Sequence, residues 1–535
     1  MRFPAILRWA GLSLVGAGAL AAMGFGGGPA DRAIAEAERQ DRKAAAGAPA
    51  GAAFTLNGVT VDGVSVYDRA ELAPLYADYL AREVTVADLA AIAQAITDRY
   101  RADGYFLARA VTPRQTDAAG LARLVVYEGQ VDEVAFDGDA SPAVGALFSD
   151  ITRFRPLKLR ELDRRLALAN DLPGTKVAAR FEPDLDDPSR HRLVITTTLD
   201  RFEGQIYADN RGGEHAGPWQ VYTRGALNSA VRSGDQLAVG LLTTPADVAE
   251  FSQADIAYSY PLLTGGSLRI GAAASEARDG ADGIAAALGN RSVSASVRIS
   301  HPLVRSQRRS LWVTGALEAR RSEQDWAAAQ LVDEVAVARA STQGHMALAK
   351  GYVSGTAQVS RGLGGFGGDP RDGRSRADAD ATFWKVNLSS AFYHDLGDKA
   401  GVYLAANGQW SPDALLASEE FAAGGLPVGR AYDYAEIMGD KGLSGLAEFR
   451  VGWDPNLRPL TFFQTYAFID GAKVWNDGAP AGWSSAALAS AGAGLRLVFG
   501  DRITVRAEGA KPLTRKPFYR TDKDWRGFVS VSSTF

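Results

Sequence analysis

The sequence predicts two small α+β domains followed by an antiparallel β-barrel of about 16 strands. Two observations lead to this fold class. Between residues 54 and about 200, strand and helix patterns follow one another in an order that occurs twice. From about Arg201 to Phe535, apolar and polar residues alternate with a period of two, segment after segment. A length of 535 residues accommodates both parts.

Composition excludes several classes of function. The net charge is -4 and the pI about 5.9, so the chain has no general electrostatic attraction for nucleic acid. It contains no cysteine, which excludes disulfides, cysteine metal sites and thiol catalysis. The absence of thiols also suits passage through an oxidising compartment.

Residues 1–30 have the layout of a secretory signal peptide. Arg2 and Arg8 are followed by an apolar run at residues 9–25, and A-x-A cleavage motifs occur at residues 19–21 and 33–35. The alternative is a membrane anchor, for which the run is short and rich in glycine compared with a span of ~20 residues. No later stretch reaches ~18 consecutive apolar residues, so any further crossing of a membrane must use strands.

Residues 31–53 predict a polar helix followed by a linker. Asp31 can cap the helix, and Gly47 and Pro49 end it. The helix has no apolar stripe, which leaves two interpretations: a linker helix, or a polar plug in a wet cavity such as a barrel lumen.

The first α+β domain is predicted at residues 54–130. It begins with a strand at 54–61, and a helix starts at Thr85 with Asp88 in the capping-box position. Leu89, Ile92, Ile96 and Tyr100 share one face of that helix. Strands at 105–113 and 122–129 complete the domain.

The second α+β domain, at residues 131–199, repeats this order. A strand at 131–138 precedes a helix at 158–171, whose Leu159, Leu162 and Leu166 lie on one face. Strands at 176–183 and 191–199 follow. The repeat is one of structure and not of sequence identity.

The barrel is predicted at residues 200–535. In "SVSASVRIS" (292–300) the apolar residues share one face, and the same holds in "AEFRVGW" (447–453) and "ITVRAEG" (503–509). A soluble β-sandwich also alternates, but its strands are shorter and its apolar face is buried. Here the polar faces carry both signs of charge, and aromatic residues lie near strand ends, as a membrane barrel with a wet lumen requires.

No pattern indicates catalysis, a cofactor or a metal. The G-x-G-x-x-G at residues 362–367 is followed by no helix that could receive a phosphate, and we interpret it as an external loop. A barrel protease or phospholipase requires a histidine-based constellation at one rim. The five histidines (His191, His215, His301, His345 and His394) are scattered and do not support one.

The order of these parts resembles the TpsB transporters of two-partner secretion, the FhaC/ShlB-like members of the POTRA-barrel superfamily. "YRADGYFLARAVTPRQ" and "VVYEGQV" are similar to the first POTRA domain of that family, with Tyr105, Pro113, Gln115, Glu128 and Gly129 in matching places. "LANDLPG" (168–174) is similar to the second. The resemblance implies that residues 54–130 and 131–199 are two POTRA domains in the periplasm of a Gram-negative bacterium and that residues 200–535 form a barrel in its outer membrane.

The resemblance also directs attention to "GGLPVGRAYDY" (424–434). The family carries a Val-Arg-Gly-Tyr/Phe motif at the tip of a loop folded into the barrel, which corresponds here to Gly429, Arg430, Ala431 and Tyr432. Its partner motif, F-x-D, corresponds to Phe468 and Asp470.

The residues themselves support an inward-folded loop. The segment of about residues 411–443 is long for a simple connection. An arginine in a lumen requires a carboxylate, and we expect Asp470 to pair with Arg430. Tyr466, Phe468 and Asp470 share a strand face that apolar loop residues would cover. The alternative is a solvated loop arginine.

The resemblance implies an outer-membrane transporter that captures an unfolded TpsA-type partner, such as an adhesin or cytolysin, through its POTRA domains. Phe535 ends the last amphipathic strand and resembles the signal by which barrel-assembly machinery inserts proteins into outer-membrane lipid. A barrel-assembly insertase is the alternative, although such proteins usually carry three or more POTRA domains. A passive porin would have no need of periplasmic domains.

Overall fold

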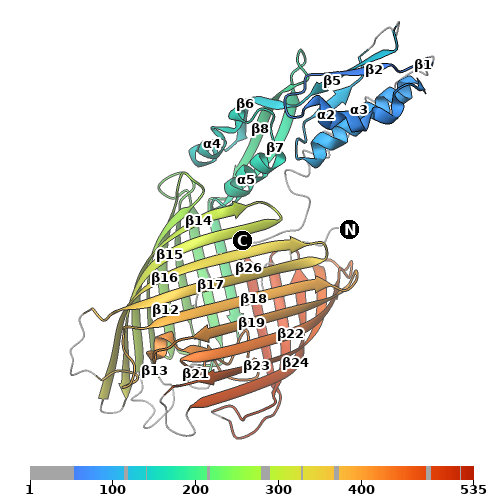
Figure 1. The fold of residues 1–535 in the computed structure, drawn as a ribbon. Helices are drawn as coiled ribbons and strands as arrows, with labels where there is room; N and C mark the ends of the chain where they lie inside the picture. Colours follow the sequence, from blue (N-terminus) through green and yellow to red (C-terminus); the bar gives the residue numbers. More distant parts are fainter. Residues whose placement is uncertain are drawn as a thin grey trace. The chain divides into compact units, whose positions relative to one another are not determined.

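The computed structural model describes residues 53–535 except 114–118, 140, 214–216, 279–288, 327–328, 367–372, 478–483 and 519. The signal peptide predicted at residues 1–30 and the polar helix predicted at 31–53 lie outside the described residues, apart from Ala53. The chain divides into two compact units, one ending at Leu199 and the other containing residues 200–535 (Figure 1). No helix in the described ranges is both long and apolar enough to cross a membrane.

The first half of the first unit is a small sheet with one long helix. Its elements, in chain order, are β1 (Phe54–Thr55), β2 (Gly58–Asp62), α2 (Arg69–Leu72), two 3₁₀ turns (Ala73–Leu75 and Ala77–Tyr79), β3 (Glu83–Val84), α3 (Val86–Ala102), β4 (Arg109–Val111) and β5 (Leu121–Tyr127). The sheet order is β2-β5-β4, with β2 parallel to β5, whereas β1 pairs with β3 alone among the described residues. The strand predicted at 54–61 is therefore two strands, since the chain changes partner between Thr55 and Gly58.

Helix α3 begins as the sequence predicts. The Thr85 N–H donates to Asp88 Oδ2 over 2.7 Å, and the Asp88 N–H donates to Thr85 Oγ1 over 3.3 Å. The first of these bonds lowers the pKa of the Asp88 carboxyl. The predicted apolar face is confirmed, because Leu89, Ile92, Ile96 and Tyr100 are all buried.

The second half of this unit repeats the topology of the first. Its elements are β6 (Gln130–Gly138), α4 (Pro142–Phe148), a 3₁₀ turn (Ile151–Arg153), α5 (Leu159–Asn170), β7 (Thr175–Pro183) and β8 (Arg190–Leu199). The sheet order is β6-β8-β7, with β6 parallel to β8. The predicted internal repeat of structure is thus confirmed, although β6 begins one residue before the expected boundary at 131.

The two halves share side chains at their junction. Phe106 and Leu107, which precede β4, are buried in the second half's hydrophobic core. The Leu157 N–H donates to Gly129 O over 3.1 Å, and the Leu159 N–H donates to Gly104 O over 2.8 Å. This junction therefore includes both apolar packing and backbone hydrogen bonds.

The second unit is a closed antiparallel barrel of 16 strands, as predicted. The strands are β9 (Phe202–Asp209), β10 (Gln220–Asn228), β11 (Gln236–Thr243), β12 (Phe251–Pro261), β13 (Ser267–Arg278), β14 (Gly289–Arg305), β15 (Arg309–Trp326), β16 (Ala329–Leu348), β17 (Gly351–Gly364), β18 (Trp384–Asp395), β19 (Ala400–Trp410), β22 (Lys441–Trp453), β23 (Leu460–Trp475), β24 (Ser485–Phe499), β25 (Ile503–Pro512) and β26 (Arg526–Thr534). Closure leaves no free sheet edge, as a lipid environment requires.

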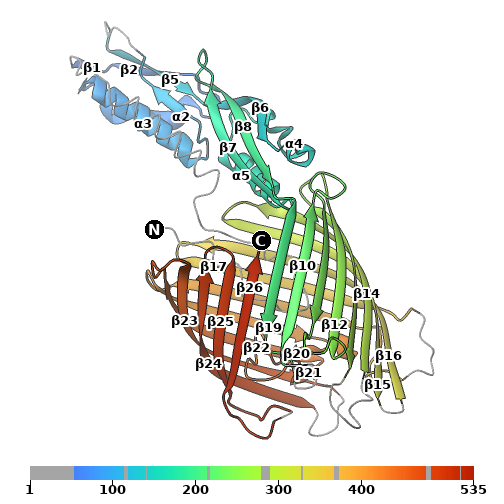
Figure 2. The ribbon, with the colours of Figure 1, turned by 180° about the vertical axis from the view of Figure 1, so that it is seen from behind.

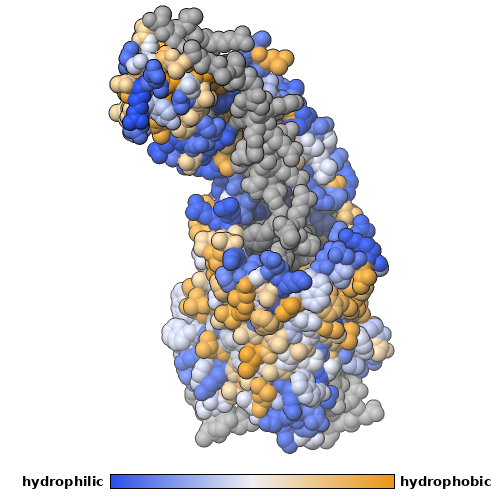
Figure 3. Space-filling view, turned by 90° about the vertical axis from the view of Figure 1, so that its right-hand side faces the viewer, coloured by the Kyte–Doolittle hydropathy of each residue, from blue (hydrophilic) through white to orange (hydrophobic). Residues whose placement is uncertain are grey.

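The two faces of the barrel wall differ in polarity. On β14, Val293, Val297 and Ile299 are about half exposed on the outer face. On β22, Glu448 and Arg450 face inward and are almost fully buried. Figure 3 shows hydrophobic residues gathered over the barrel wall and hydrophilic ones at its lower end. This pattern is typical of a lipid-facing exterior around a polar lumen.

The barrel closes between β26 and β9, which are joined by a register running from Ser530↔Asp209 to Thr534↔Gln205 (Figure 2). Phe535 extends this pairing, because its N–H donates to Gly204 O over 3.0 Å and its carbonyl accepts from Gly204 N over 2.8 Å. A Cβ on Gly204 would lie 2.1 Å from the Phe535 ring, so a larger residue there would require the ring to move.

Residues 411–440 connect β19 to β22, and we call them the inward loop. They contain a 3₁₀ turn (Ala417–Glu419) and a two-stranded sheet of β20 (Phe421–Ala423) and β21 (Ile437–Gly439). Both strands lie within the outline of the barrel in Figure 2, and loop residues share a buried cluster with lumenal side chains. The loop was expected at about 411–443; it ends at Asp440, because β22 begins at Lys441.

Candidate functional site at the tip of the inward loop

Glycines shape the tip of the inward loop. Gly429 has a φ of +88°, and a Cβ there would lie 2.8 Å from Gly424 Cα and 3.0 Å from Leu488 Cδ1. A β-branched valine, which the family motif has at this position, would be strained in this backbone. The Tyr432 N–H donates to Gly429 O over 2.8 Å, which closes the turn around Arg430. Ala431 fits the site usually held by glycine and is fully buried.

The Arg430 side chain lies between two glutamates of the lumenal wall. Its Nη1 is 3.0 Å from Glu448 Oε2 on β22 and 3.1 Å from Glu508 Oε2 on β25. Its guanidinium carbon lies 4.3 Å from the centre of the Phe468 ring on β23. Arg430 and both glutamates are at most 4 % exposed, so these charges are paired out of contact with water.

Asp470 binds the backbone of the loop tip. Its Oδ1 accepts from the Gly429 N–H over 2.9 Å, and its Oδ2 accepts from the Arg430 N–H over 3.4 Å. Ser490 Oγ also donates to Oδ1, over 2.6 Å. The distance from Asp470 Oδ2 to Arg430 Nε is 3.9 Å, so the carboxylate is not in a bidentate pair with the guanidinium. The structure brings the predicted partners together, but mainly through the main chain.

Further arginines complete the ion-pair network. Glu448 Oε1 accepts from Arg450 Nε over 2.7 Å and from Arg496 Nη2 over 2.6 Å. Glu508 Oε1 accepts from Arg211 Nη2 over 2.6 Å, and Arg211 Nη1 donates to the Arg430 carbonyl over 3.2 Å. We call Arg430, Glu448, Asp470, Glu508 and Arg211 the tip cluster.

Apolar loop residues cover the inward aromatic side chains, as predicted. Val428, Ala431 and Tyr432 pack in one buried cluster with Tyr466 and Phe468. The Tyr432 hydroxyl lies 3.1 Å from the carbonyl oxygens of Ala489 and of Arg515 and can donate to either. The tip is thus held by ion pairs, hydrogen bonds and apolar contacts together.

Sequence reasoning found Arg430 and Asp470 but missed Glu448 and Glu508. Both glutamates lie on polar faces of strands that the alternation identified, so their inward direction was predictable. Their proximity to Arg430 was not, because it depends on the register of β22, β23 and β25. That register places Glu448 opposite Phe468 on β23 and Glu508 opposite Gly494 on β24.

The first two glycines of the G-x-G-x-x-G segment lie in a strand. Gly362 and Gly364 were predicted to lie in an external loop and instead belong to the end of β17, while Gly367 is outside the described residues. A Cβ on Gly362 would lie 2.2 Å from Ala381 O, which explains this glycine by close packing. Among the described residues, no group of three or more His, Cys, Asp or Glu side chains could hold a metal ion.

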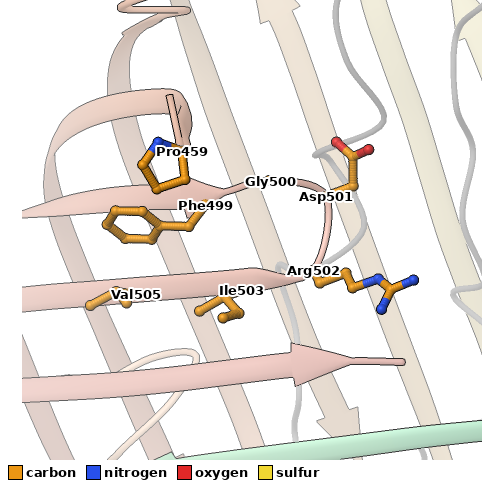
Figure 4. Close-up of a pocket in the computed structure, with 7 residues that line it drawn as sticks. All are labelled: Pro459, Phe499, Gly500, Asp501, Arg502, Ile503 and Val505. Carbon is orange, nitrogen blue, oxygen red and sulfur yellow. The ribbon is translucent and has the colours of Figure 1, made fainter. Parts of the chain in front are cut away.

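A pocket lies at the turn between β24 and β25 (Figure 4). Phe499, Ile503 and Val505 contribute its apolar side chains, whereas Asp501 and Arg502 extend from the turn. Ile503 is 42 % exposed, on the outer face of the wall. The pocket is therefore apolar on the side of the barrel wall and charged at the turn.

Comparison with known families decides the identity of the barrel. Residues 192–497 match the family described as haemolysin secretion/activation protein ShlB/FhaC/HecB. The chain belongs to this family. Residues 54–129 match the ShlB-type POTRA domain. The ShlB/FhaC/HecB barrel and its POTRA region place the protein in the outer membrane, with the POTRA region in the periplasm.

Relatives of known description extend over most of the chain. The heme/hemopexin transporter protein HuxB of Haemophilus influenzae (strain 86-028NP) is 23 % identical over 460 residues, covering 83 % of this chain and 80 % of its own. The outer membrane transporter CdiB of Escherichia coli is 24 % identical over 476 residues, covering 84 % and 77 %.

Solved structures show the same fold. CdiB from Escherichia coli has a TM-score of 0.71 at 21 % identity and covers 95 % of this chain and 99 % of its own. BamA from Haemophilus ducreyi lacking POTRA domains 1–3 has a TM-score of 0.54 at 13 % identity, covering 90 % and 100 %. The resemblance to the ShlB/FhaC/HecB family inferred from sequence motifs is confirmed.

Proposed function

We propose that the protein captures an unfolded, secreted partner polypeptide in the periplasm and passes it through the barrel to the cell surface. Membership of the ShlB/FhaC/HecB secretion family is the observation that carries this proposal. HuxB and CdiB, which are named as transporters, support it as relatives over most of the chain.

The first unit offers edges for capture. Its sheets, in the order β2-β5-β4 and β6-β8-β7, each end on both sides in a strand with one partner among the described residues. An extended polypeptide can add to such an edge through main-chain hydrogen bonds, which do not depend on its sequence. This mode of binding suits a TpsA-type partner that is still unfolded.

The inward loop is the element that must move for a chain to pass. It carries Arg430 into the lumen and is held by the tip cluster, whose contacts are non-covalent and reversible. We propose that the cluster is a lock that keeps the loop in the lumen at rest. Folding of the partner outside the cell would supply the driving force, since the sequence has no nucleotide-binding motif.

Phe535 is proposed to serve assembly of the barrel. It lies at the closing seam, 54 % exposed and paired with Gly204. Barrel-assembly machinery can recognise an exposed aromatic residue at this position before the barrel closes in lipid. The proposal includes no catalytic step and no cofactor.

The test is export of a TpsA-type partner, which we expect a neighbouring gene to encode. A Gram-negative host lacking both genes receives the partner alone, with the wild-type chain, or with Arg430→Lys, and the partner is measured in the medium. Export should require the chain. It should fall with Arg430→Lys, because lysine lacks the Nε that donates to the Pro427 carbonyl and the planar guanidinium that lies on the Phe468 ring, so the tip no longer rests in the position from which transport begins. Arg278→Lys, on an arginine whose side chain is 64 % exposed, is the matched control.

The alternative of a barrel-assembly insertase predicts a different result. Loss of the chain would then reduce the amounts of other outer-membrane barrels while the partner still reached the medium. That outcome would refute the export function.

A further inference from the structure

A second set of contacts holds the inward loop at residues 414–420, which we call the shoulder. The shoulder contains the 3₁₀ turn at Ala417–Glu419, and Glu419 is only 2 % exposed. A carboxylate buried to this degree requires cationic partners. No sequence motif pointed to this region.

Two cations of the lumenal wall bind Glu419. Arg339 on β16 donates through Nη2 to Oε1 over 2.7 Å and through Nη1 to Oε2 over 3.1 Å. Lys385 Nζ on β18 lies 2.7 Å from Oε2 and also donates to the Glu419 carbonyl over 2.8 Å. The bidentate arginine fixes both the position and the orientation of the carboxylate.

The carboxylate of Glu419 stays ionised because of these partners. Burial raises its pKa, but the charges of Lys385 and Arg339 outweigh burial and hold the pKa at about 2.

Apolar and polar contacts reinforce the shoulder. Leu415 and Leu416 are buried with Phe383, Val335 and Val337 in one cluster. In the connection between β17 and β18, Arg376 Nη1 lies 2.6 Å from Glu420 Oε1 and 2.7 Å from Asp440 Oδ1. The shoulder is thus attached to β16, β18 and the connection between β17 and β18.

The shoulder and the tip cluster rely on different parts of the barrel. Side chains on β22, β23 and β25, with Arg211, bind the tip, whereas side chains on β16 and β18, with Arg376, bind the shoulder. Among the described residues, none of these side chains belongs to both sets of contacts, so the two sets can be broken separately.

We propose that Glu419 is a second latch of the inward loop, which fixes the shoulder to Arg339 and Lys385 independently of the tip cluster. Loss of the tip contacts frees the residues around Arg430 while the shoulder stays on the wall. The loop leaves the lumen only when both sets of contacts are broken. That its departure opens an export route rests on the proposed function, whereas the latch itself does not.

Two thiol reporters test the latch in the full-length protein. The chain contains no cysteine, so each introduced thiol is unique. The Ser418 Oγ is buried and has no hydrogen-bond partner in the described part of the chain, so Ser418→Cys reports on the shoulder without removing such a bond. Ala431→Cys, at a fully buried position, reports on the tip. The rate of maleimide labelling measures how often each site opens.

Glu419→Gln should raise the labelling rate of Ser418→Cys about 10-fold or more and leave that of Ala431→Cys within about twofold. Arg430→Met should do the reverse. Glu419→Asp, which keeps the charge on a shorter side chain, should give an intermediate rate at Ser418→Cys. Lys385→Gln, which removes one of the two cations, should also expose the shoulder selectively, and it serves if Glu419→Gln does not fold.

Three results would overturn the latch: exposure of both reporters by Glu419→Gln, exposure of neither reporter by it, or exposure of both reporters by Arg430→Met. Heat-modifiable migration of the barrel in gels shows that each variant is folded. Labelling requires no exported partner, so the labelling rates test the latch even if the protein does not export one. Secretion of the partner is measured separately and tests the export function even if the latch is refuted.

Discussion

Replacing Arg430 with methionine tests most directly whether the tip cluster holds the inward loop. Methionine keeps an unbranched apolar stem that can pack on Phe468, but it removes the positive charge. The substitution leaves Glu448 and Glu508 without their contacts at 3.0 and 3.1 Å. It also removes the guanidinium from its position 4.3 Å from the Phe468 ring centre.

The loss of docking free energy depends on which ion pairs the two glutamates keep. Removing one partner of a buried ion pair costs roughly 3–5 kcal/mol. Glu448 keeps Arg450 and Arg496, and Glu508 keeps Arg211, so the lower end of that range applies. A loss of about 3 kcal/mol in the free energy of docking corresponds to roughly a 100-fold increase in the undocked population, at 1.36 kcal/mol per factor of ten.

The assay is the labelling rate of Ala431→Cys by a maleimide, with and without Arg430→Met. When the loop returns faster than it is labelled, the rate is proportional to the undocked population. Tyr434→Cys, at a position that is 61 % exposed on the same loop, controls for access of the reagent and should be labelled equally in both backgrounds. A rate at Ala431→Cys that stays within about twofold of the Arg430 parent would refute the claim that the tip cluster holds the loop.

Four further outcomes are expected. Asp470→Asn should raise the labelling rate of Ala431→Cys by about tenfold, less than Arg430→Met, because it weakens the bonds to the Gly429 and Arg430 N–H groups and leaves the glutamates in place. Glu508→Gln combined with Arg430→Met should raise the labelling rate of Ala431→Cys much less than the product of the two separate increases, since both substitutions remove the same contact between Arg430 and Glu508. Fully independent effects would contradict the pairing. Thr85→Ala should lower the unfolding free energy of a fragment of residues 53–199 by about 1 kcal/mol in denaturant titrations, with Thr85→Ser as the near-neutral control. Deleting Phe535 should reduce the heat-modifiable, assembled form of the barrel, and normal assembly without it would show that Phe535 is no assembly signal.

Local sequence patterns were sufficient to predict the elements that are stabilised by residues close to one another in the sequence. The capping box at Thr85 and Asp88 and the apolar face of α3 are set within one helix, and both were found as predicted. The alternation on β14, β22 and β25 likewise fixed which side chains face lipid. In contrast, the first predicted strand was divided in two, because its ends pair with β3 and β5, which lie far apart in the chain.

By itself, the sequence determined the repeated α+β order and the barrel with its inward and outward faces, and the resemblance to the family identified Arg430 and Asp470 as neighbours. Only the tertiary structure decided how those neighbours meet. Asp470 binds the main chain of the tip, while Glu448, Glu508 and, at the shoulder, Arg339 and Lys385 bind the charged side chains. The reason is physical: strand alternation gives the direction of a side chain, but its partner across the lumen depends on the register and closure of all 16 strands.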